Sequence, residues 1–392
     1  MLVPELASWL VDRSRAAPPL PELFVGFCER LILAGVPVCR ASLGLETLHP
    51  EESGTQLVWR DGALEALDAS RIGLLTDTSY LNSPVRVVDE TNRPFRWRRG
   101  ESTQGMPLLD QLQADAVTDY VILPLPFLDD TRTATLSFAT RADGGFAPST
   151  FDELERAARL LSPWAERVVL RRIAIDLLAA YLGPVAGRLV YDGQIERGDV
   201  RTITAAIWFC DLRGFTALAD RLPRREVVAL LNRWFDVVGA AITAAGGEIL
   251  KFMGDGLLAV FPIDDDATAT CDAALAAAEA ALAGMAALDA ELAAEGREPM
   301  RFGLALHLGD LEHGNIGTAQ RLDFTVIGPA VNLASRLEGL TKELGEPVLA
   351  SAAFAAAAGR PLRRIGSFPL RGLDEATEVF AMARGEGLLG AT

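Results

Sequence analysis

The residues Leu250-Lys251-Phe252-Met253-Gly254-Asp255-Gly256-Leu257 place a Gly-Asp-Gly turn between two apolar runs. Two strands joined through such a tight turn form a hairpin, and the turn projects its carboxylate away from the strands. An ordinary Asp-Gly turn gives the same pattern, so Asp255 needs a partner before it indicates chemistry.

A second carboxylate stands upstream, in Trp208-Phe209-Cys210-Asp211-Leu212-Arg213-Gly214-Phe215-Thr216. An apolar strand ends at Asp211 and runs into a glycine-containing turn. An acid there, followed by free backbone N–H groups, can bind Mg²⁺ and hold phosphate oxygens, so Gly214 and Phe215 are candidate substrate-binding residues. Taken alone, Asp211 is equally explained as a capping or turn residue. Two aspartates at strand ends together indicate a two-metal phosphoryl-transfer site.

A third cluster is rich in glycine. It consists of Gly309-Asp310-Leu311-Glu312-His313-Gly314-Asn315-Ile316-Gly317 and of Phe324-Thr325-Val326-Ile327-Gly328-Pro329-Ala330-Val331-Asn332-Leu333-Ala334-Ser335-Arg336. Asn332 and Arg336 are four residues apart and share one face of a helix. An amide beside a guanidinium suits a ribose oxygen and a charged phosphoryl group. The alternative is an ordinary surface helix.

These clusters lie in a region that predicts a mixed α/β (α+β) fold. Its expected elements alternate between extended and helical patterns. They are strand Thr202–Cys210, helix Arg224–Ala245, hairpin Glu248–Phe261, an Ala-rich helix Asp266–Glu295, strand Met300–Leu308, a glycine-rich segment 309–317, helix Ala330–Leu344, and strands near Val348 and Val379.

Residues 201–385 resemble the class III nucleotidyl cyclases, which make cyclic AMP or cyclic GMP. The resemblance rests on four motifs in order: Phe-Cys-Asp-Leu-Arg-Gly-Phe-Thr, Lys-Phe-Met-Gly-Asp-Gly, Gly-Asn-Ile-Gly, and Thr-Val-Ile-Gly-Pro-Ala-Val-Asn-Leu-Ala-Ser-Arg. It implies a ferredoxin-like, palm-type catalytic domain. The reaction it implies is attack of the ribose 3′-OH of ATP on the α-phosphorus, with departure of pyrophosphate.

The resemblance also implies a role for each matching position. Asp211 and Asp255 match the two metal-binding aspartates, which imply two Mg²⁺ (or Mn²⁺) ions per active site. Lys251 matches the lysine that contacts the purine base, and Thr325 matches its partner.

The remaining matches concern the ribose and the phosphates. Asn332 matches the asparagine that positions the ribose, and Arg336 the arginine that stabilises transition-state charge. Arg371, in Pro369-Leu370-Arg371-Gly372, lies near another phosphate-facing cation of the family.

Lysine and threonine at the base positions favour ATP, because a lysine can donate to adenine N1 and a hydroxyl can accept from N6. Many relatives have aspartate at the position of Thr325, and the threonine resembles the bicarbonate-responsive branch of the family. The alternatives are a guanylate cyclase and a nucleotide-binding regulator without turnover. A diguanylate cyclase is disfavoured because Gly254-Asp255-Gly256 does not match its Gly-Gly-Asp/Glu-Glu-Phe turn.

In this family the metal ligands and the ribose- and phosphate-facing helix meet across a head-to-tail dimer. One complete set of both in this chain implies a homodimer with two shared sites.

The sequence of residues 1–165 contains fewer indications of function. Their pattern predicts a largely helical run from Leu6 to Ala34, extended stretches at Cys39–Thr47, Gln56–Arg60, Tyr120–Phe127 and Thr133–Thr140, a hairpin turn at 128–131, and a helix from Phe151. This arrangement resembles a GAF-type sensor domain, followed by a helical linker at 166–200 and the catalytic domain at 201–385.

Two features of this domain could bind a small-molecule ligand. Cys28 and Cys39 could anchor a tetrapyrrole or form a redox switch, although small core residues are the simpler interpretation. An arginine cluster around Trp97 could bind an anionic ligand or the partner domain, although a solvated loop is the default interpretation: Arg93, Arg96, Arg98 and Arg99.

Composition excludes several classes of function. The 392 residues carry 37 Lys plus Arg against 53 Asp plus Glu, a formal net charge of −16, which disfavours nucleic acids and anionic membranes as partners. The four cysteines form no CxxC pair and make no zinc spacing with the three histidines. We find no signal peptide and no apolar run of about 18 residues, and predict a cytoplasmic protein.

Overall fold

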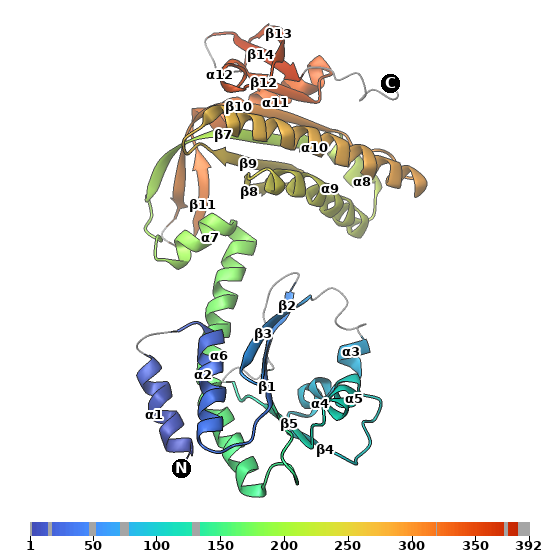
Figure 1. The fold of residues 1–392 in the computed structure, drawn as a ribbon. Coiled ribbons are helices and arrows are strands. Elements are labelled where there is room, and N and C mark those ends of the chain that lie inside the picture. The colour runs from blue at the N-terminus through green and yellow to red at the C-terminus, as the bar shows by residue number, and fades with distance from the viewer. Residues whose placement is uncertain are drawn as a thin grey trace. The chain divides into compact units, whose positions relative to one another are not determined.

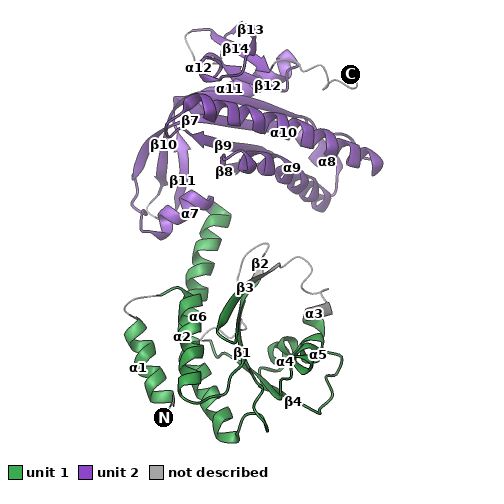
Figure 2. Cartoon of the chain, viewed as in Figure 1, with its two compact units in different colours: residues 1–181 green, residues 182–392 purple. Residues whose placement is uncertain are grey.

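The structure is a computed structural model, and it describes residues 2–14, 18–46, 52–70, 78–127, 134–318, 320–371 and 375–382. The chain divides into two compact units, Met1–Tyr181 and Leu182–Thr392 (Figure 2). Each unit has its own sheet and its own buried core. Gly183, with a φ of 90°, follows the last residue of the long helix that ends at this division.

The first unit is built on a six-stranded antiparallel sheet in the order β3-β2-β1-β6-β5-β4 (Figure 1). Its strands are β1 (Arg40–Glu46), β2 (Glu52–Arg60), β3 (Ala63–Ser70), β4 (Phe95–Arg98), β5 (Asp119–Pro124) and β6 (Ala134–Thr140). The predicted pairing of the last two strands is confirmed, because β5 pairs with β6. The hairpin turn predicted at 128–131 lies outside the described residues.

Helices cover both faces of this sheet. Its helices are α1 (Leu2–Ser14), α2 (Leu20–Leu33), α3 (Thr78–Leu81), α4 (Pro84–Thr91), α5 (Pro107–Ala114) and α6 (Pro148–Leu182). Side chains alternate along β1, so Ala41 and Leu43 face the core built by α1, α2 and α6. On the other face α4 and α5 enclose Trp97 and Tyr120.

The largely helical region predicted at Leu6–Ala34 is confirmed and consists of two helices, α1 and α2. Pro18 and Pro19 precede α2, and proline cannot donate the backbone hydrogen bond that a continuous helix needs. The region between residues 60 and 120, for which the sequence predicted no helix or strand, contains β3, α3, α4, β4 and α5. All of these elements have eight residues or fewer, so each shows too little periodicity to be recognised.

The second unit contains an eight-stranded sheet whose main path runs β13-β14-β12-β10-β7-β9-β8, with β11 paired to β10. Its strands are β7 (Val200–Leu212), β8 (Glu248–Met253), β9 (Gly256–Pro262), β10 (Phe302–Gly317), β11 (Leu322–Ile327), β12 (Val348–Ser351), β13 (Leu362–Phe368) and β14 (Thr377–Met382). All neighbours are antiparallel except β10 and β12. The segment 309–317, expected to be a separate glycine-rich stretch, continues β10, because it pairs with both β7 and β11.

Helices also cover both faces of the second sheet (Figure 1). They are α7 (Pro184–Tyr191), α8 (Phe215–Arg221), α9 (Arg224–Ala244), α10 (Ala267–Ala294), α11 (Pro329–Leu344) and α12 (Ala352–Ala357). One core joins α9 and α10 to the sheet. On the opposite face Ala330 and Ala334 of α11 pack on Ala205 and Ile207 of β7.

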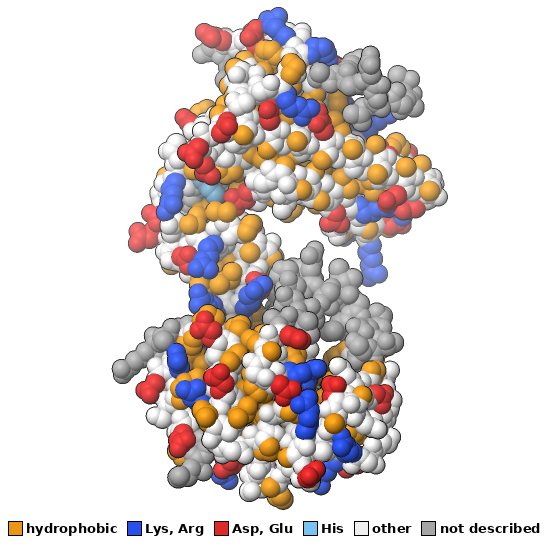
Figure 3. All heavy atoms as spheres, in the orientation of Figure 1, with side chains coloured by type: hydrophobic (Ala, Val, Ile, Leu, Met, Phe, Trp, Pro, Cys, Tyr) orange, Lys and Arg blue, Asp and Glu red, His pale blue; other side chains and the backbone are white. Residues whose placement is uncertain are grey.

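By length and composition alone, α9 and α10 are apolar enough to cross a membrane. Their buried side chains, including Trp234 of α9 and Met285 of α10, pack with Trp208 in the core of this unit. Part of the apolar surface of each helix is therefore packed in the interior of the unit. On the face that Figure 3 shows, acidic and basic side chains of the described residues are interspersed.

Candidate active site

Asp211 lies in a row across three strands, with a glycine on each side. Backbone pairing aligns it with Gly303 of β10 and with Gly256 of β9. A Cβ at position 256 would lie 3.0 Å from Asp211 Oδ1, and a Cβ at position 303 would lie 2.3 Å from Glu338 Oε1. Gly256 therefore accommodates the Asp211 carboxylate and Gly303 accommodates the side chains of Glu338 and Thr341, so a side chain at either position would displace them.

Asp255 brings a second carboxyl group within hydrogen-bonding reach of Asp211. Burial, followed by repulsion from Asp255, raises the pKa of Asp211 from 3.8 to about 6. The Leu212 N–H donates to Asp211 Oδ1 at 3.2 Å, and Trp234 Nε1 donates to the Asp255 carbonyl oxygen at 3.2 Å. Two adjacent acids held in this way form a site that attracts positive charge.

The pair fits a divalent cation of the Mg²⁺ type. Carboxylate oxygens are its preferred protein ligands, and Asp211 and Asp255 bring two carboxyl groups within hydrogen-bonding reach of each other. Within the described residues no group of three His, Cys, Asp or Glu side chains could hold a metal ion. Substrate oxygens and water would therefore complete the coordination around Asp211 and Asp255.

Gly214 and Phe215 follow β7 directly and turn the chain into α8. Gly214 has a φ of 73°, in the left-handed region that glycine adopts without strain. The Phe215 side chain packs against the core, so only its backbone is free to contact a ligand. In the described part of the chain no side chain caps α8, and its first N–H groups are available to an oxygen ligand.

Lys251 of β8 forms an ion pair with Asp323 of β11, a contact that the sequence patterns did not predict. Asp323 and Thr325 are two residues apart on β11 and share a face of that strand. The Lys251 ammonium, the Asp323 carboxylate and the Thr325 hydroxyl are thus placed on one side of the β8–β11 junction. The alternation of Asp323 with buried Phe324 is the sequence signal that could have indicated this.

Asn332 and Arg336 lie outside the buried stripe of α11, which consists of Ala330, Ala334, Leu337, Leu340 and Thr341. Asn332 is exposed and Arg336 is half-buried. No contact between either side chain and Asp211 or Asp255 is found among the described residues. Arg371, between β13 and β14, is exposed as well. Among the described residues, one chain therefore brings the two aspartates together without a contact from Asn332 or Arg336.

Glu338 is a third acid in this region that the sequence patterns did not indicate. Burial, followed by repulsion from Asp211, raises its pKa from 4.5 to about 7. The nearby guanidinium of Arg213 acts in the opposite direction on this pKa and donates to the carbonyl oxygens of Thr341 and Glu346 at 3.0 and 2.9 Å. Since Glu338 is placed by the packing of α11 over Gly303, its spacing from Asp211 in the sequence carries no signal.

In the first unit Arg96 is not free to bind an anion. Its Nε and NH2 atoms donate to Asp119 Oδ1 and Oδ2 at 3.0 and 2.6 Å, and Asp119 is fully buried. NH2 also donates to the Phe146 carbonyl oxygen at 2.8 Å. Trp97 is buried beside them. Of the predicted arginine cluster, Arg96 thus has a structural role, and the remaining arginines are exposed.

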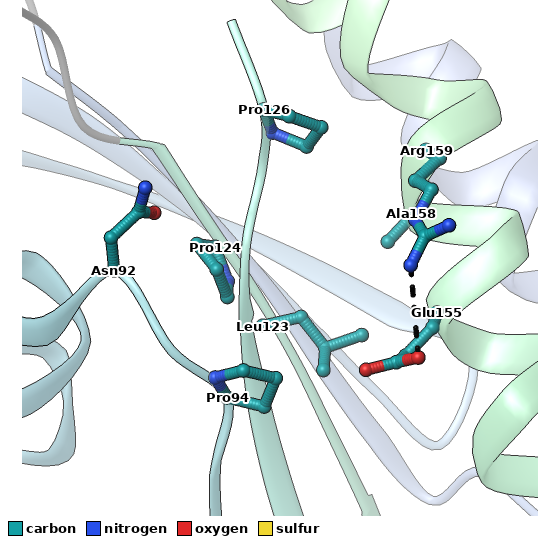
Figure 4. Close-up of a pocket in the computed structure, with 8 residues that line it drawn as sticks. All are labelled: Asn92, Pro94, Leu123, Pro124, Pro126, Glu155, Ala158 and Arg159. Carbon is teal, nitrogen blue, oxygen red and sulfur yellow. Dashed lines mark ion pairs between the residues drawn. The ribbon is translucent and has the colours of Figure 1, made fainter. Parts of the chain in front are cut away.

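The thiols of Cys28 and Cys39 are free. Burial raises the pKa of both, which disfavours the reactive thiolate. Figure 4 shows a cavity of about 260 Å³ elsewhere in this unit, between β5, the connection from α4 to β4, and α6. Its polar lining is Asn92 and the ion pair of Arg159 with Glu155, whose nitrogen and oxygen are 3.9 Å apart.

Comparison with known proteins places the site in a family. Residues 200–353 match the adenylate and guanylate cyclase catalytic domain. The chain is 35% identical over 190 residues to an adenylate cyclase of Anabaena cylindrica, covering 47% of this chain and 36% of that protein. It is 33% identical over 178 residues to adenylate cyclase 1 of Rhizobium meliloti, covering 44% of this chain and 26% of that protein.

Among solved structures the chain is similar to the adenylyl cyclase CyaB from P. aeruginosa. The identity is 27% and the TM-score 0.44, and the match covers 49% of this chain and 100% of that one. The chain spans only about a quarter to a third of the length of the curated relatives named above.

Proposed function

Because residues 200–353 belong to the class III nucleotidyl cyclase catalytic domain family, we propose that the protein is an adenylate cyclase, a phosphorus–oxygen lyase that converts ATP to 3′,5′-cyclic AMP and pyrophosphate. The observation that carries the proposal is the Asp211–Asp255 pair, held in hydrogen-bonding reach between two glycines. The presence of Asn332 and Arg336 together with this pair disfavours a nucleotide-binding regulator without turnover.

The choice of ATP over GTP rests on the base-facing groups. Adenine accepts a hydrogen bond at N1 and donates one at N6, and Lys251 supplies a donor beside the acceptors Asp323 and Thr325. Guanine presents the opposite pattern on the same edge, with a donor at N1 and an acceptor at O6. The Lys251 ammonium could still donate to O6, so the substrate assignment depends on the acceptors of β11.

The reaction is an intramolecular displacement at the α-phosphorus. Asn332 would orient the ribose, so that the 3′-OH lies in line with the departing pyrophosphate, and Arg336 would stabilise the charge that develops on the phosphates. The free N–H groups at Gly214 and Phe215, with Arg371, would bind phosphate oxygens. Mg²⁺ or Mn²⁺ ions bound to Asp211 and Asp255 would supply a lowered hydroxyl pKa and neutralisation of the pyrophosphate.

We infer that the working enzyme is a head-to-tail homodimer with two sites. Asn332 and Arg336 have no contact with the aspartate pair among the described residues, and this supports the dimer. In it, the aspartates of one chain would face Asn332 and Arg336 of the second copy. The first unit would act as a regulatory domain with a small molecule as its ligand, and its GAF-like character and the cytoplasmic location remain predictions. Bicarbonate sensitivity is a further hypothesis based on Thr325.

The decisive test measures cyclic nucleotide formation from ATP and from GTP by the purified chain, with Mg²⁺ and with Mn²⁺. Cyclic AMP from ATP, lost in Asp255→Asn and retained in the surface control Glu343→Gln, is the expected result. Cyclic GMP as the main product would reassign the protein as a guanylate cyclase. Saturable ATP binding without product, in a folded dimer, would support a regulator without turnover.

A further inference from the structure

The second unit contains a cavity of about 560 Å³ that has no part in the proposed reaction. It lies between α7, the chain that leads from α7 into β7, and the strands β7, β8 and β11. None of the residues assigned to the metal, the base, the ribose or the phosphates lines it. Its volume is within the range of small-molecule binding sites, about 300–1,000 Å³.

The wall formed by the chain between α7 and β7 is held firmly to the sheet. Asn315, only 3% exposed, donates from Nδ2 to the Gln194 carbonyl oxygen at 2.9 Å. Its backbone N–H donates to the Asp199 carbonyl oxygen at 2.9 Å, and its carbonyl oxygen accepts from the Gly198 N–H at 3.0 Å. A Cβ at Gly314 would lie 2.0 Å from the Asp199 oxygen, so the two segments are in direct contact. The cavity is therefore preformed.

Two buried polar atoms at this cavity have no hydrogen-bond partner: Glu248 Oε1 and His313 Nε2. A buried polar atom without a partner is unfavourable, and such atoms are rare in folded proteins. Phe324 holds the His313 ring edge-to-face, with the ring centroids 4.8 Å apart. Burial lowers the pKa of His313 and so favours the neutral imidazole. The Glu248 carboxyl group accepts backbone hydrogen bonds from Val185 and Ala186 at the start of α7, and its Oε1 atom is the one without a partner.

The lining indicates what kind of molecule would satisfy them. Val185 and Leu189 of α7 face Ile203 and Phe324 of the sheet across an apolar interior. The polar lining includes Gln194, Asp199, the guanidinium of Arg201 and the carboxyl group of Glu248. Burial raises the pKa of Glu248, and hydrogen bonds from the backbone of Val185 and Ala186 act in the opposite direction. While Glu248 is ionised, its free oxygen can only accept hydrogen bonds. A cationic N–H donor gives such an oxygen its strongest hydrogen bond.

We propose that this cavity binds a small amphipathic amine, with its apolar body between α7 and the sheet and its ammonium group on Glu248. The site adjoins the strands that carry the base-facing residues, since Lys251 follows Glu248 on β8 and Thr325 follows Phe324 on β11. A molecule bound there contacts both strands and α7 at once. An influence of this molecule on the base-facing residues rests on the proposed function, whereas the binding itself does not.

The test uses the full-length chain and phenethylamine as the probe, with binding measured by isothermal titration calorimetry. Phenethyl alcohol and phenylacetate have the same aromatic body and test the charge preference. Glu248→Gln removes the charge with little change of shape, and Val185→Trp fills the cavity from the partly exposed side of α7. Glu343→Gln, on the exposed surface of α11, is the matched control.

We expect saturable binding in the order amine, alcohol, acid for both the unmodified protein and Glu343→Gln. Loss of the charge-assisted bond in Glu248→Gln should weaken amine binding by about tenfold or more. Val185→Trp should abolish binding while leaving Glu248 in place. The absence of saturable binding, tighter binding of phenylacetate, or unchanged amine affinity in both variants would overturn the proposal and leave the cavity as a hydrated space. These outcomes do not depend on cyclase activity.

Discussion

The Lys251 ammonium forms an ion pair with Asp323, two residues before Thr325 on the same face of β11. The lysine and the aspartate are 41% and 52% exposed, which leaves both accessible to a nucleotide. Lys251 is therefore oriented before substrate binds, by a residue that the family motifs do not include.

We expect Asp323→Asn to weaken ATP selection. Loss of an exposed ion pair is worth about 0.2–1 kcal/mol, so the KM for ATP should rise by up to about fivefold with a smaller change in kcat. Initial rates with ATP and GTP measure both constants. Glu291→Gln, which breaks another exposed ion pair with Arg233, is the control. An unchanged ratio of kcat/KM for the two nucleotides would show that Asp323 is only a surface residue.

We expect Gly303→Ala to lower the free energy of unfolding strongly. Its Cβ would lie 2.2 Å from Thr341 Oγ1 and 2.3 Å from Glu338 Oε1, and overpacking of this kind costs about 1–3 kcal/mol. Denaturant unfolding measures the loss of stability, and cyclase assays should show loss of activity because α11 is displaced.

Gly339→Ala, on α11, is the matched control for Gly303→Ala. No atom lies within 4 Å of the Cβ it would add, among the atoms that the structure describes. Alanine should instead stabilise the helix by up to about 1 kcal/mol. Equal stability of the two variants would contradict the close packing of α11 on Gly303.

His307 should make the free energy of unfolding depend on pH. Burial lowers its pKa from 6.5 to about 4, and its Nδ1 lies 2.7 Å from Ser351 Oγ. The unfolded chain takes up a proton on this histidine below its ordinary pKa, whereas the folded chain does so only near pH 4. Its contribution is therefore complete above pH 6.5 and is lost as the pH falls toward 4.

The measurement is a set of chemical unfolding curves between pH 4 and pH 8, for the unmodified chain and for His307→Gln. The difference between the two should shrink by up to about 3 kcal/mol on acidification. Parallel curves for the two proteins would mean that His307 has the same pKa in the folded and unfolded states.

Mixing two inactive chains should restore activity if the sites are shared. Asp211→Ala removes the metal-binding half of a site, and Asn332→Ala removes the ribose-binding half. In a mixed dimer, one site combines the two unchanged halves and is intact, and the other combines the two changed halves. With random association, about a quarter of the normal activity should return. A mixture of Asp211→Ala with Asp255→Ala is the control, because both changes remove the same half. No recovery in an isolated mixed dimer would refute the shared site.

The amino-acid sequence alone indicated the two aspartates that the structure brings together in the second unit. Asp211 ends an apolar run that leads into a glycine-containing turn, and Asp255 lies between two glycines after an apolar run. Two carboxylates placed in this way are typical of a metal site. The long helices were predictable for a similar reason, since α9 and α10 each extend over many turns of consistent pattern. Both signals are local in the chain.

Only the tertiary structure decided which distant residues share a surface. Glu338 approaches Asp211 because strand register aligns Gly303 with Asp211 and α11 crosses above that row. Asp323 reaches Lys251 because β11 folds back along β10 toward β8. Gly314 and Asn315, which lie in a glycine-rich motif, hold the chain that enters β7 and so help to form the cavity beside Glu248. Such contacts depend on register and helix packing, which pair residues far apart in the chain and leave no periodic trace in the sequence.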